Sequence, residues 1–130
     1  MENEKQIVEF FLKSQVPAQK NQKVMAINRR TGKPFPMTSK SVAKWKSDAN
    51  DLLDLLEIKE IVGPVEISLN FVHKDKRKRD IDNEVSTVLD LLKNRKIIED
   101  DNCFVLKKIV AQFDGVSKEN PGVYVKIAQI

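Results

Sequence analysis

The sequence is poor in thiol and imidazole side chains, with one cysteine and one histidine among 130 residues. A single thiol, Cys103, excludes a disulfide framework and a zinc site made of several thiolates from one chain. This usage is consistent with a reducing cytoplasm. Cys103 is expected to lie in the core rather than to act as a nucleophile. His73 fits the solvent-facing end of a strand better than a catalytic role.

Long apolar runs are absent as well. No run approaches the ~18 residues of a membrane-spanning helix, and the N-terminal residues MENEKQ lack the apolar core of a signal peptide. We therefore expect a soluble, cytoplasmic protein without a membrane partner. A chain of 130 residues is close to the usual size of one domain and long enough to bury a core, so residues 1–130 are expected to form a single domain.

Acidic residues are missing from the whole interval between Glu9 and Asp48. The net charge is only +4, but cations are concentrated in this interval and in a second cluster over residues 74–79. Concentrated cations indicate an anionic partner, and nucleic acid is the commonest one. A solvated, solubilising surface is the alternative. The cations of the two regions are Lys13, Lys20, Lys23, Arg29, Arg30, Lys33, Lys40, Lys44, Lys46, Lys74, Lys76, Arg77, Lys78 and Arg79.

Hydrophobic patterning predicts an α+β domain with a mixed sheet and two main helices. Strands are expected at 6–13, 65–72, 103–113 and 123–127, and the last two form a C-terminal hairpin. A basic hairpin or extended loop is expected over 14–37, around the turn signal at 29–34. A helix over 39–57 is capped by Thr38 or Ser39 and buries Trp45, and a helix over 83–94 is capped by Asp82.

Carboxylates flank the second predicted helix. Asp80 and Asp82 are two residues apart at the end of a strand, a spacing that puts both side chains on one face. The helix is expected to carry the chain away and back, so that Asp100 and Asp101 arrive beside the first pair. Clustered carboxylates repel one another unless a cation lies among them, and Mg²⁺ prefers such oxygen ligands. With phosphate-binding cations adjacent, this set predicts metal-assisted phosphodiester hydrolysis. A simple helix cap at Asp82 and a simple turn at Asp100 and Asp101 are the alternatives.

The run R-D-I-D-N at 79–83, then L-D-L-L at 89–92 and I-I-E-D-D at 97–101, followed by a strand with lysine, resembles the RusA family of Holliday-junction resolvases. The resemblance implies a homodimeric, Mg²⁺-dependent endonuclease that nicks a four-way DNA junction symmetrically, with Mn²⁺ as a possible substitute and no small-molecule cofactor. It implies that Asp80, Asp82 and Asp101 bind the metal with Asp100 close by, that Asn83 and Asp90 support the site, and that Arg79 contacts phosphate.

One position departs from the family pattern. The family usually has a lysine four residues after the second aspartate, where this chain has Ser86. Serine cannot neutralise charge on a phosphate. We hypothesise that Lys93, two turns along the same helical face, or Lys107 or Lys108 takes over this role, and we count Lys93 among the catalytic candidates. Reduced or altered activity is the other possibility.

A four-way junction has two-fold symmetry, so a dimer with the same symmetry presents one active site to each of two related strands. The basic residues Lys20, Arg29, Arg30, Lys74, Lys76, Arg77, Lys78 and Arg79 are expected to bind DNA, with salt-dependent affinity and little sequence preference. Three other functions stay open. They are a catalytically weak or inactive nucleic-acid-binding module, a nuclease of other branched DNA or of RNA, and a structural protein with a charged surface.

Overall fold

The computed structural model describes residues 4–18 and 23–130, and everything below concerns these residues. Two helices and six strands follow one another along the chain. Their order is β1 (Ile7–Lys13), β2 (Lys23–Ile27), β3 (Pro34–Thr38), α1 (Lys40–Leu56), β4 (Val65–His73), α2 (Ile81–Asn94), β5 (Leu106–Val116) and β6 (Gly122–Gln129). None of these helices is long and apolar enough to cross a membrane.

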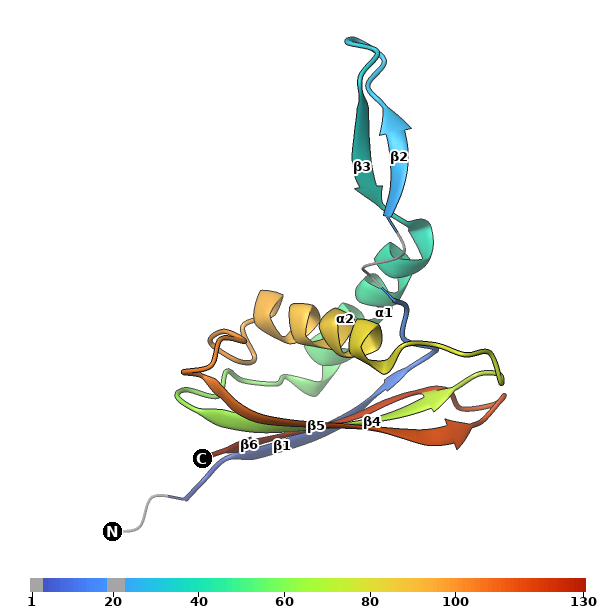
Figure 1. Cartoon of the computed structure of the whole chain (residues 1–130). Helices are drawn as coiled ribbons and strands as arrows, with labels where there is room; N and C mark the ends of the chain where they lie inside the picture. The colour runs from blue at the N-terminus through green and yellow to red at the C-terminus, as the bar shows by residue number, and fades with distance from the viewer. Residues whose placement is uncertain (1–3, 19–22) are drawn as a thin grey trace.

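The body of the molecule is a four-stranded sheet with both helices on one face (Figure 1). The strand order is β1-β6-β4-β5; β4 pairs antiparallel with β6 and parallel with β5, so the sheet is mixed. Alternate residues of β4, from Val65 to His73, are buried beneath the helices, as the period-two pattern predicts. The predicted α+β class is confirmed.

The predicted C-terminal hairpin is wrong. β5 and β6 are consecutive in the chain, but β4 lies between them in the sheet and pairs with both. The cause is the α2 crossover, which returns the chain parallel to β4 on its open side. β5 is consequently an edge strand of the sheet.

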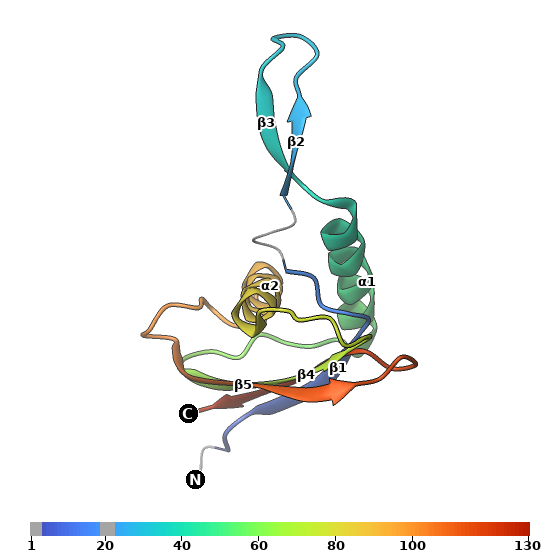
Figure 2. The same ribbon diagram turned by 45° about the vertical axis from the view of Figure 1, so that its right-hand side comes forward.

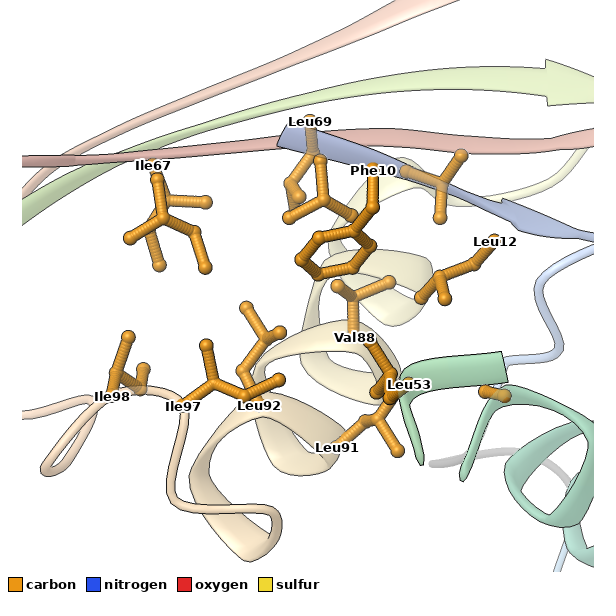
Figure 3. Packing of buried hydrophobic residues seen from close by; sticks show 14 of the residues in the cluster. Phe10, Leu12, Leu53, Ile67, Leu69, Val88, Leu91, Leu92, Ile97 and Ile98 are labelled. Atoms are coloured by element: carbon orange, nitrogen blue, oxygen red, sulfur yellow. The ribbon is translucent and has the colours of Figure 1, made fainter. Parts of the chain in front are cut away.

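The core lies between the sheet and the two helices (Figure 3). Leu53 of α1 and Val88 of α2 meet the inward face of the sheet, and Ile97 and Ile98 extend the apolar layer beyond the end of α2. Trp45 is buried on the α1 stripe, as predicted. The prediction for Cys103 is wrong, because it lies exposed in the turn before β5, where no helix covers the chain.

The helix starts follow from local capping. Ser39 caps α1, since its hydroxyl oxygen accepts a hydrogen bond from the Val42 backbone N–H at 3.3 Å. α2 starts two residues earlier than predicted, with Asp80 in the N-cap position, so Asp82 lies in the first turn and is not the cap. This shift brings both aspartates to the N-terminal end of the helix.

β2 and β3 form a separate two-stranded hairpin, which we call the arm (Figures 1 and 2). The arm projects away from the body, and its register runs from Lys23 opposite Thr38 to Ile27 opposite Pro34. In the turn, the Asn28 side chain accepts hydrogen bonds from the backbone N–H groups of Arg30 and Thr31. Of the two alternatives expected over 14–37, the basic hairpin is confirmed, with its strands between residues 23 and 38, and Arg29 and Arg30 are exposed at its tip.

Candidate functional site

Asp80 and Asp82 lie at the N-terminal end of α2, where the helix dipole stabilises negative charge. Both side chains are exposed, and the Asp80 carboxylate makes no capping hydrogen bond to the helix. Their oxygens are therefore available to a ligand. Carboxylate oxygens are the donors that Mg²⁺ prefers, and one or two of them suffice when phosphate and water complete its shell.

The basic loop, residues 74–79, joins β4 to this end of α2 and is folded around Arg79. The Arg79 guanidinium pairs with Asp75 at 2.9 Å and donates weaker hydrogen bonds to the backbone carbonyls of Asp75 and Arg77. Its side chain is only 17% exposed, whereas that of Arg77 is 81% exposed. The Arg77 backbone N–H, together with Arg79, holds the pKa of Asp75 below its ordinary value. Arg79 thus organises the loop, while Lys74, Lys76, Arg77 and Lys78 face solvent.

Two cavities flank the basic loop and share most of its cations. One, of about 330 Å³, lies between the loop, Ile81 and Phe113. The other, of about 310 Å³, lies between the loop, Ser41 and the segment Gln15–Ala18, with Glu84 in its lining. Both are lined by Arg77, Lys78 and Arg79, a positive lining that attracts anions. Asp80 follows Arg79 directly in the chain.

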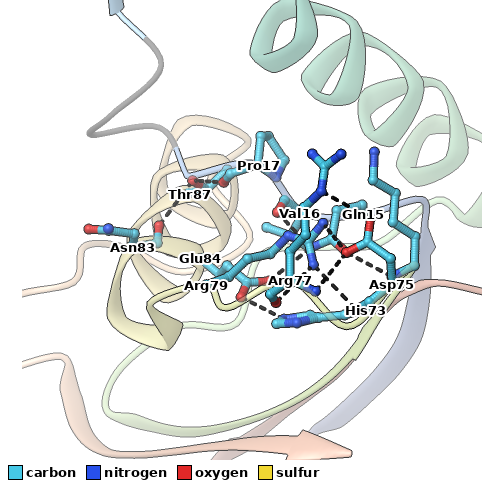
Figure 4. A network of polar contacts seen from close by, with 11 residues as sticks. Gln15, Val16, Pro17, His73, Asp75, Arg77, Arg79, Asn83, Glu84 and Thr87 are labelled. Carbon is cyan, nitrogen blue, oxygen red and sulfur yellow. Dashed lines mark hydrogen bonds and ion pairs between the residues drawn. The ribbon is translucent and has the colours of Figure 1, made fainter. Parts of the chain in front are cut away.

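A buried pair of titratable groups supports the loop from behind (Figure 4). His73, the last residue of β4, is 5% exposed, and Glu84, in the first turns of α2, is 1% exposed. Their Nε2 and Oε1 atoms are 2.7 Å apart. The expectation that His73 faces solvent is therefore wrong, because it continues the buried alternation of β4.

The same pair is joined to the segment after β1. The Gln15 amide donates to the second Glu84 oxygen at 3.3 Å and accepts from the Lys74 backbone N–H at 2.9 Å. We call Gln15, His73 and Glu84 the polar ring, which Lys74 closes through its covalent bond to His73. Burial raises the pKa of Glu84 to about 7, against the opposing effects of Arg79 and Gln15. Burial, helped by the Arg79 cation, lowers the pKa of His73.

The second acidic pair does not join the first within one chain. Asp100 and Asp101 follow the C-terminal end of α2, and the 14 residues of this helix rise about 21 Å. No three His, Cys, Asp or Glu side chains of residues 4–18 and 23–130 come together to hold a metal ion. The prediction that the helix brings the two pairs together is wrong, because the return after α2 stays at the far end and leads directly into β5.

Local contacts hold this second pair. The Asp100 carboxylate accepts hydrogen bonds from the Asp101 backbone N–H at 2.7 Å and from the Asn102 side chain at 3.1 Å. These bonds lower the pKa of Asp100. Asp101 is exposed, and its carboxylate lies 3.7 Å from the Lys93 ammonium. Of the two, Asp101 has the carboxylate less engaged with its own turn.

The lysines considered as substitutes at Ser86 lie elsewhere. The Ser86 hydroxyl donates to the Asp82 backbone carbonyl at 3.1 Å and stays on the helix surface. Lys93 is beside Asp101 at the opposite end of α2. Lys107 lies over the Phe104 ring at 5.7 Å, and Lys108 is exposed on β5 opposite Glu66. If Lys93 acts on a phosphate, it acts together with the second acidic pair.

The two residues predicted to support the site are both tied into the body. Asn83 is buried, and its backbone N–H donates to the Asp80 carbonyl at 3.2 Å. Asp90 forms an ion pair of 2.8 Å with Lys46 and so joins α2 to α1. Among the predicted DNA-binding residues, Arg29 and Arg30 lie at the arm tip, and Lys20 lies outside the described residues.

Gln15 and Glu84 are polar residues near the site that the sequence did not single out. Glu84 carried a signal, since it precedes the buried residues Val88 and Leu91 at helical spacing. A carboxylate on an apolar stripe needs a partner, and His73 is the only imidazole in the chain. Gln15 carried no such signal in the sequence, because its partners Lys74 and Glu84 lie 59 and 69 positions away along the chain.

Comparison with known proteins gives one positive finding. The family model described as endodeoxyribonuclease RusA matches residues 11–128 of the chain, from within β1 to within β6. No curated protein matches the chain. The match covers the arm, the basic loop, both acidic pairs and the whole of α2.

Proposed function

The chain belongs to the family of RusA endodeoxyribonucleases, and on that premise we propose that it resolves Holliday junctions by Mg²⁺-dependent, paired nicks as a homodimer. Membership implies nuclease activity on branched DNA. Mg²⁺ dependence, symmetric cleavage and the residue roles are our proposal. Asp80, Asp82 and Asp101 hold the metal in it, with Asp100 beside them.

The observation that carries the proposal is the adjacency of the basic loop to the first acidic pair. Four exposed cations, Lys74, Lys76, Arg77 and Lys78, directly precede two exposed carboxylates. A phosphate held by the loop lies next to Asp80 and Asp82, and Mg²⁺ is commonly bound by one or two carboxylates together with substrate phosphates. When bound, the metal activates water and stabilises the leaving oxygen.

The separation of the two acidic pairs supports the homodimer. A helix about 21 Å long keeps Asp82 and Asp101 of one chain apart, so a site that uses both needs two chains. In a dimer with two-fold symmetry, the first pair of one protomer meets the second pair of its partner, and the reverse contact forms the second site. Two sites related in this way suit the two related strands of a junction.

The surface that we propose for this dimer is β5 with its inward face. Ile109 and Phe113 lie in register with the buried Ile67 and Phe71, yet they are 39% and 51% exposed, because α2 does not cover the edge strand. An edge strand of 11 residues with apolar side chains needs a cover. β5 begins five residues after Asp101, so a second copy packed here reaches the second acidic pair.

Two neighbouring residues of β5 test this surface with a matched control. Ile109 faces inward and Val110 faces the opposite side of the sheet, and both are partly exposed. We expect Ile109→Lys to give a monomer in sedimentation velocity and to abolish cleavage, while Val110→Lys stays dimeric. A wild-type monomer, or equal effects of the two variants, would refute this surface.

DNA affinity is assigned to the arm and the basic loop. Arg29 and Arg30 extend the positive charge away from the body, and Arg77 and its neighbours supply it beside the carboxylates. Contacts of this kind bind the phosphate backbone and carry little sequence information. Arg79 stays in the proposed set, but its first role is to hold the loop.

The deciding experiment compares a labelled four-way junction with a linear duplex, in Mg²⁺ and in EDTA, using the wild type and Asp82→Asn. We expect paired nicks in the junction only, loss of cutting in EDTA and in Asp82→Asn, and unchanged junction binding by the variant. Asp51→Asn, an exposed carboxylate on α1, is the control that keeps activity. Equal cutting of the linear duplex would instead indicate a less selective nuclease.

Ser86 favours one second candidate, a binding module of the same fold with weak or no catalysis. The serine hydroxyl is hydrogen-bonded to its own helix, and no lysine of the described residues forms an ion pair with Asp80 or Asp82. Junction binding without any cutting in Mg²⁺ or Mn²⁺ would support this candidate and refute the leading one.

A further inference from the structure

The polar ring has no part in the proposed chemistry, although it lies directly behind the basic loop. His73 precedes the first residue of the loop, and Glu84 lies four residues after Asp80, so the pair joins the two ends of the segment that carries the cations and the first carboxylates. Figure 4 shows the His73, Glu84 and Gln15 side chains gathered with Asp75, Arg77 and Arg79 in one network of polar contacts.

We propose that Glu84, His73 and Gln15 are positioning residues that fix the basic loop relative to Asp80 and Asp82. A phosphate bound by the loop then meets the carboxylates at a set distance. This inference rests on the proposed function, because it concerns the same site. The three residues act through the loop and do not touch DNA themselves.

The charge of the loop makes such an anchor necessary. Five of its six residues are cations, and Asp75 is its only acid. Like charges this close repel one another and favour an extended, mobile segment. Arg79 and Asp75 fold the loop on itself, and the polar ring ties the start of the loop to α2 and to the segment after β1.

The burial of Glu84 also supports a positioning role for this residue. A carboxyl group at 1% exposure has lost its hydration, which is costly unless polar partners replace the water. The neighbouring buried positions on α2, Val88 and Leu91, are apolar, and a leucine at position 84 would pack without that cost. What the carboxylate adds over leucine is two directed hydrogen bonds, one to the end of β4 and one to the segment after β1.

The same face of α2 also binds residues 15–17, the segment that precedes the arm. The Thr87 hydroxyl, one turn after Glu84, donates to the Pro17 carbonyl at 2.7 Å. Gln15 and Pro17 are thus bound to successive turns of one helix, just before the chain leaves for the arm. The basic loop and the segment before the arm are therefore both held by the same turns of α2, which follow Asp80 and Asp82.

Amide hydrogen exchange tests the positioning role independently of activity. Glu84→Leu removes both hydrogen bonds, Glu84→Gln keeps an acceptor and a donor in place, and Val88→Ala weakens the same helix without touching the polar ring. We expect Glu84→Leu to speed exchange across residues 74–80 by roughly tenfold or more. Glu84→Gln and Val88→Ala should leave exchange in the loop at the wild-type rate.

Junction cleavage gives the second readout. We expect Glu84→Leu to lower kcat by about tenfold to 100-fold, the size of effect that a small misplacement of reacting groups causes, with little change in KM or junction affinity. Glu84→Gln should restore kcat. If Glu84→Leu does not fold, Gln15→Leu replaces it, since Gln15 is only partly buried and contributes one side of the ring.

The outcomes separate this inference from the proposed function. Wild-type exchange rates in the loop of both Glu84→Leu and Gln15→Leu would overturn the positioning role, whatever the activity. An equal loss of kcat in Val88→Ala at the same loss of Tm would overturn it as well. If the wild type does not cut junctions, the proposed function fails, and fast exchange in Glu84→Leu still establishes what holds the loop.

Discussion

The two ends of α2 carry the same kind of side chain in opposite settings. At the N-terminal end, Asp80 and Asp82 extend from a turn that is anchored by contacts to β4 and to the segment after β1, through His73 and Gln15. At the C-terminal end, Asp100 is held by its own neighbours Asp101 and Asn102, and Asp101 lies within ion-pair distance of Lys93. One pair is preorganised by long-range contacts and the other by a local turn.

This difference indicates which end depends on something outside the chain. The first pair has its geometry set within the protomer, together with the cations that precede it. In the second pair Asp101 is exposed, and the pair precedes an edge strand whose apolar side chains are partly exposed. In the proposed dimer, the partner supplies both the cover for β5 and the missing carboxylates, so the loosely held end becomes part of a site only on assembly.

The largest expected effect distinguishes the two residues of the second pair. We predict that Asp101→Asn lowers kcat on a four-way junction by about 1,000-fold, because it removes a proposed metal ligand worth several kcal/mol. Asp100→Asn should cost about tenfold, since its carboxylate mainly holds the turn through bonds that an amide partly keeps. Single-turnover cleavage measures both. An inactive Asp100→Asn beside an active Asp101→Asn would reverse the assignment.

The next effect concerns the cation at the C-terminal end. We predict that Lys93→Ala lowers kcat by about 100-fold, as expected when a cation that neutralises phosphate charge is lost. Its effect on stability should stay below about 1 kcal/mol, because the pair with Asp101 is solvent-exposed. Lys107→Ala and Lys108→Ala are the controls. Wild-type rates in Lys93→Ala would end the idea that this lysine replaces the one missing at Ser86.

The polar ring predicts how stability depends on pH. Glu84, with its pKa raised to about 7, stabilises the fold at low pH and loses this contribution as the pH rises toward 7. His73, with a lowered pKa, stabilises it above 6.5 and loses this contribution as the pH falls. Below pH 6.5 the two effects oppose each other, because folding raises the pKa of Glu84 and lowers that of His73.

Removing the Glu84 carboxyl group should reveal the pH dependence of stability that His73 contributes by itself. In Glu84→Gln only the His73 effect remains, with Arg79 still beside it and Asp75 opposing, so we predict that stability falls from pH 7 to pH 5 by at most about 1.4 kcal/mol per pH unit relative to the wild type. Urea unfolding at several pH values measures the slope. The double variant with His73→Gln should lose it, and a parallel slope in Glu84→Gln and the wild type would contradict the opposition of the two effects.

The smallest effect separates phosphate binding from catalysis. Arg77 is highly exposed in the basic loop, so Arg77→Ala should weaken junction and duplex binding alike and reduce the salt slope of log K by about 1. The fold should be unaffected. Lys118→Ala, an exposed cation in the turn after β5, is the control. An unchanged salt slope in Arg77→Ala would remove the loop from the DNA interface.

The sequence predicts the elements well because their causes are local. Alternation over Val65–His73, the helical stripe with Trp45 and the Ser39 cap all act within a few residues. The turn signal Arg-Arg-Thr-Gly-Lys-Pro at 29–34 predicts the arm. Family motifs in the sequence also led to the nuclease assignment that the match over residues 11–128 supports.

What the sequence does not reveal are relations between distant residues. The spacing between Asp82 and Asp101 is the same whether the return runs back along α2 or stays at its far end, and the structure has the second arrangement. The placement of β4 between β5 and β6 depends on pairing across the sheet. The contacts of Gln15 with Lys74 and Glu84 arise only after three segments pack together.

One mixing experiment tests most directly whether the two ends of α2 come from two chains. Asp82→Asn and Asp101→Asn are each made as homodimers, then combined and allowed to exchange subunits in the presence of labelled junction and Mg²⁺. In a mixed dimer with shared sites, one site carries both substitutions and the other carries neither. We predict that each variant alone is inactive and that the mixture regains cutting, as nicks in one strand. A mixture as inactive as its components, beside an active wild type, would contradict the shared site.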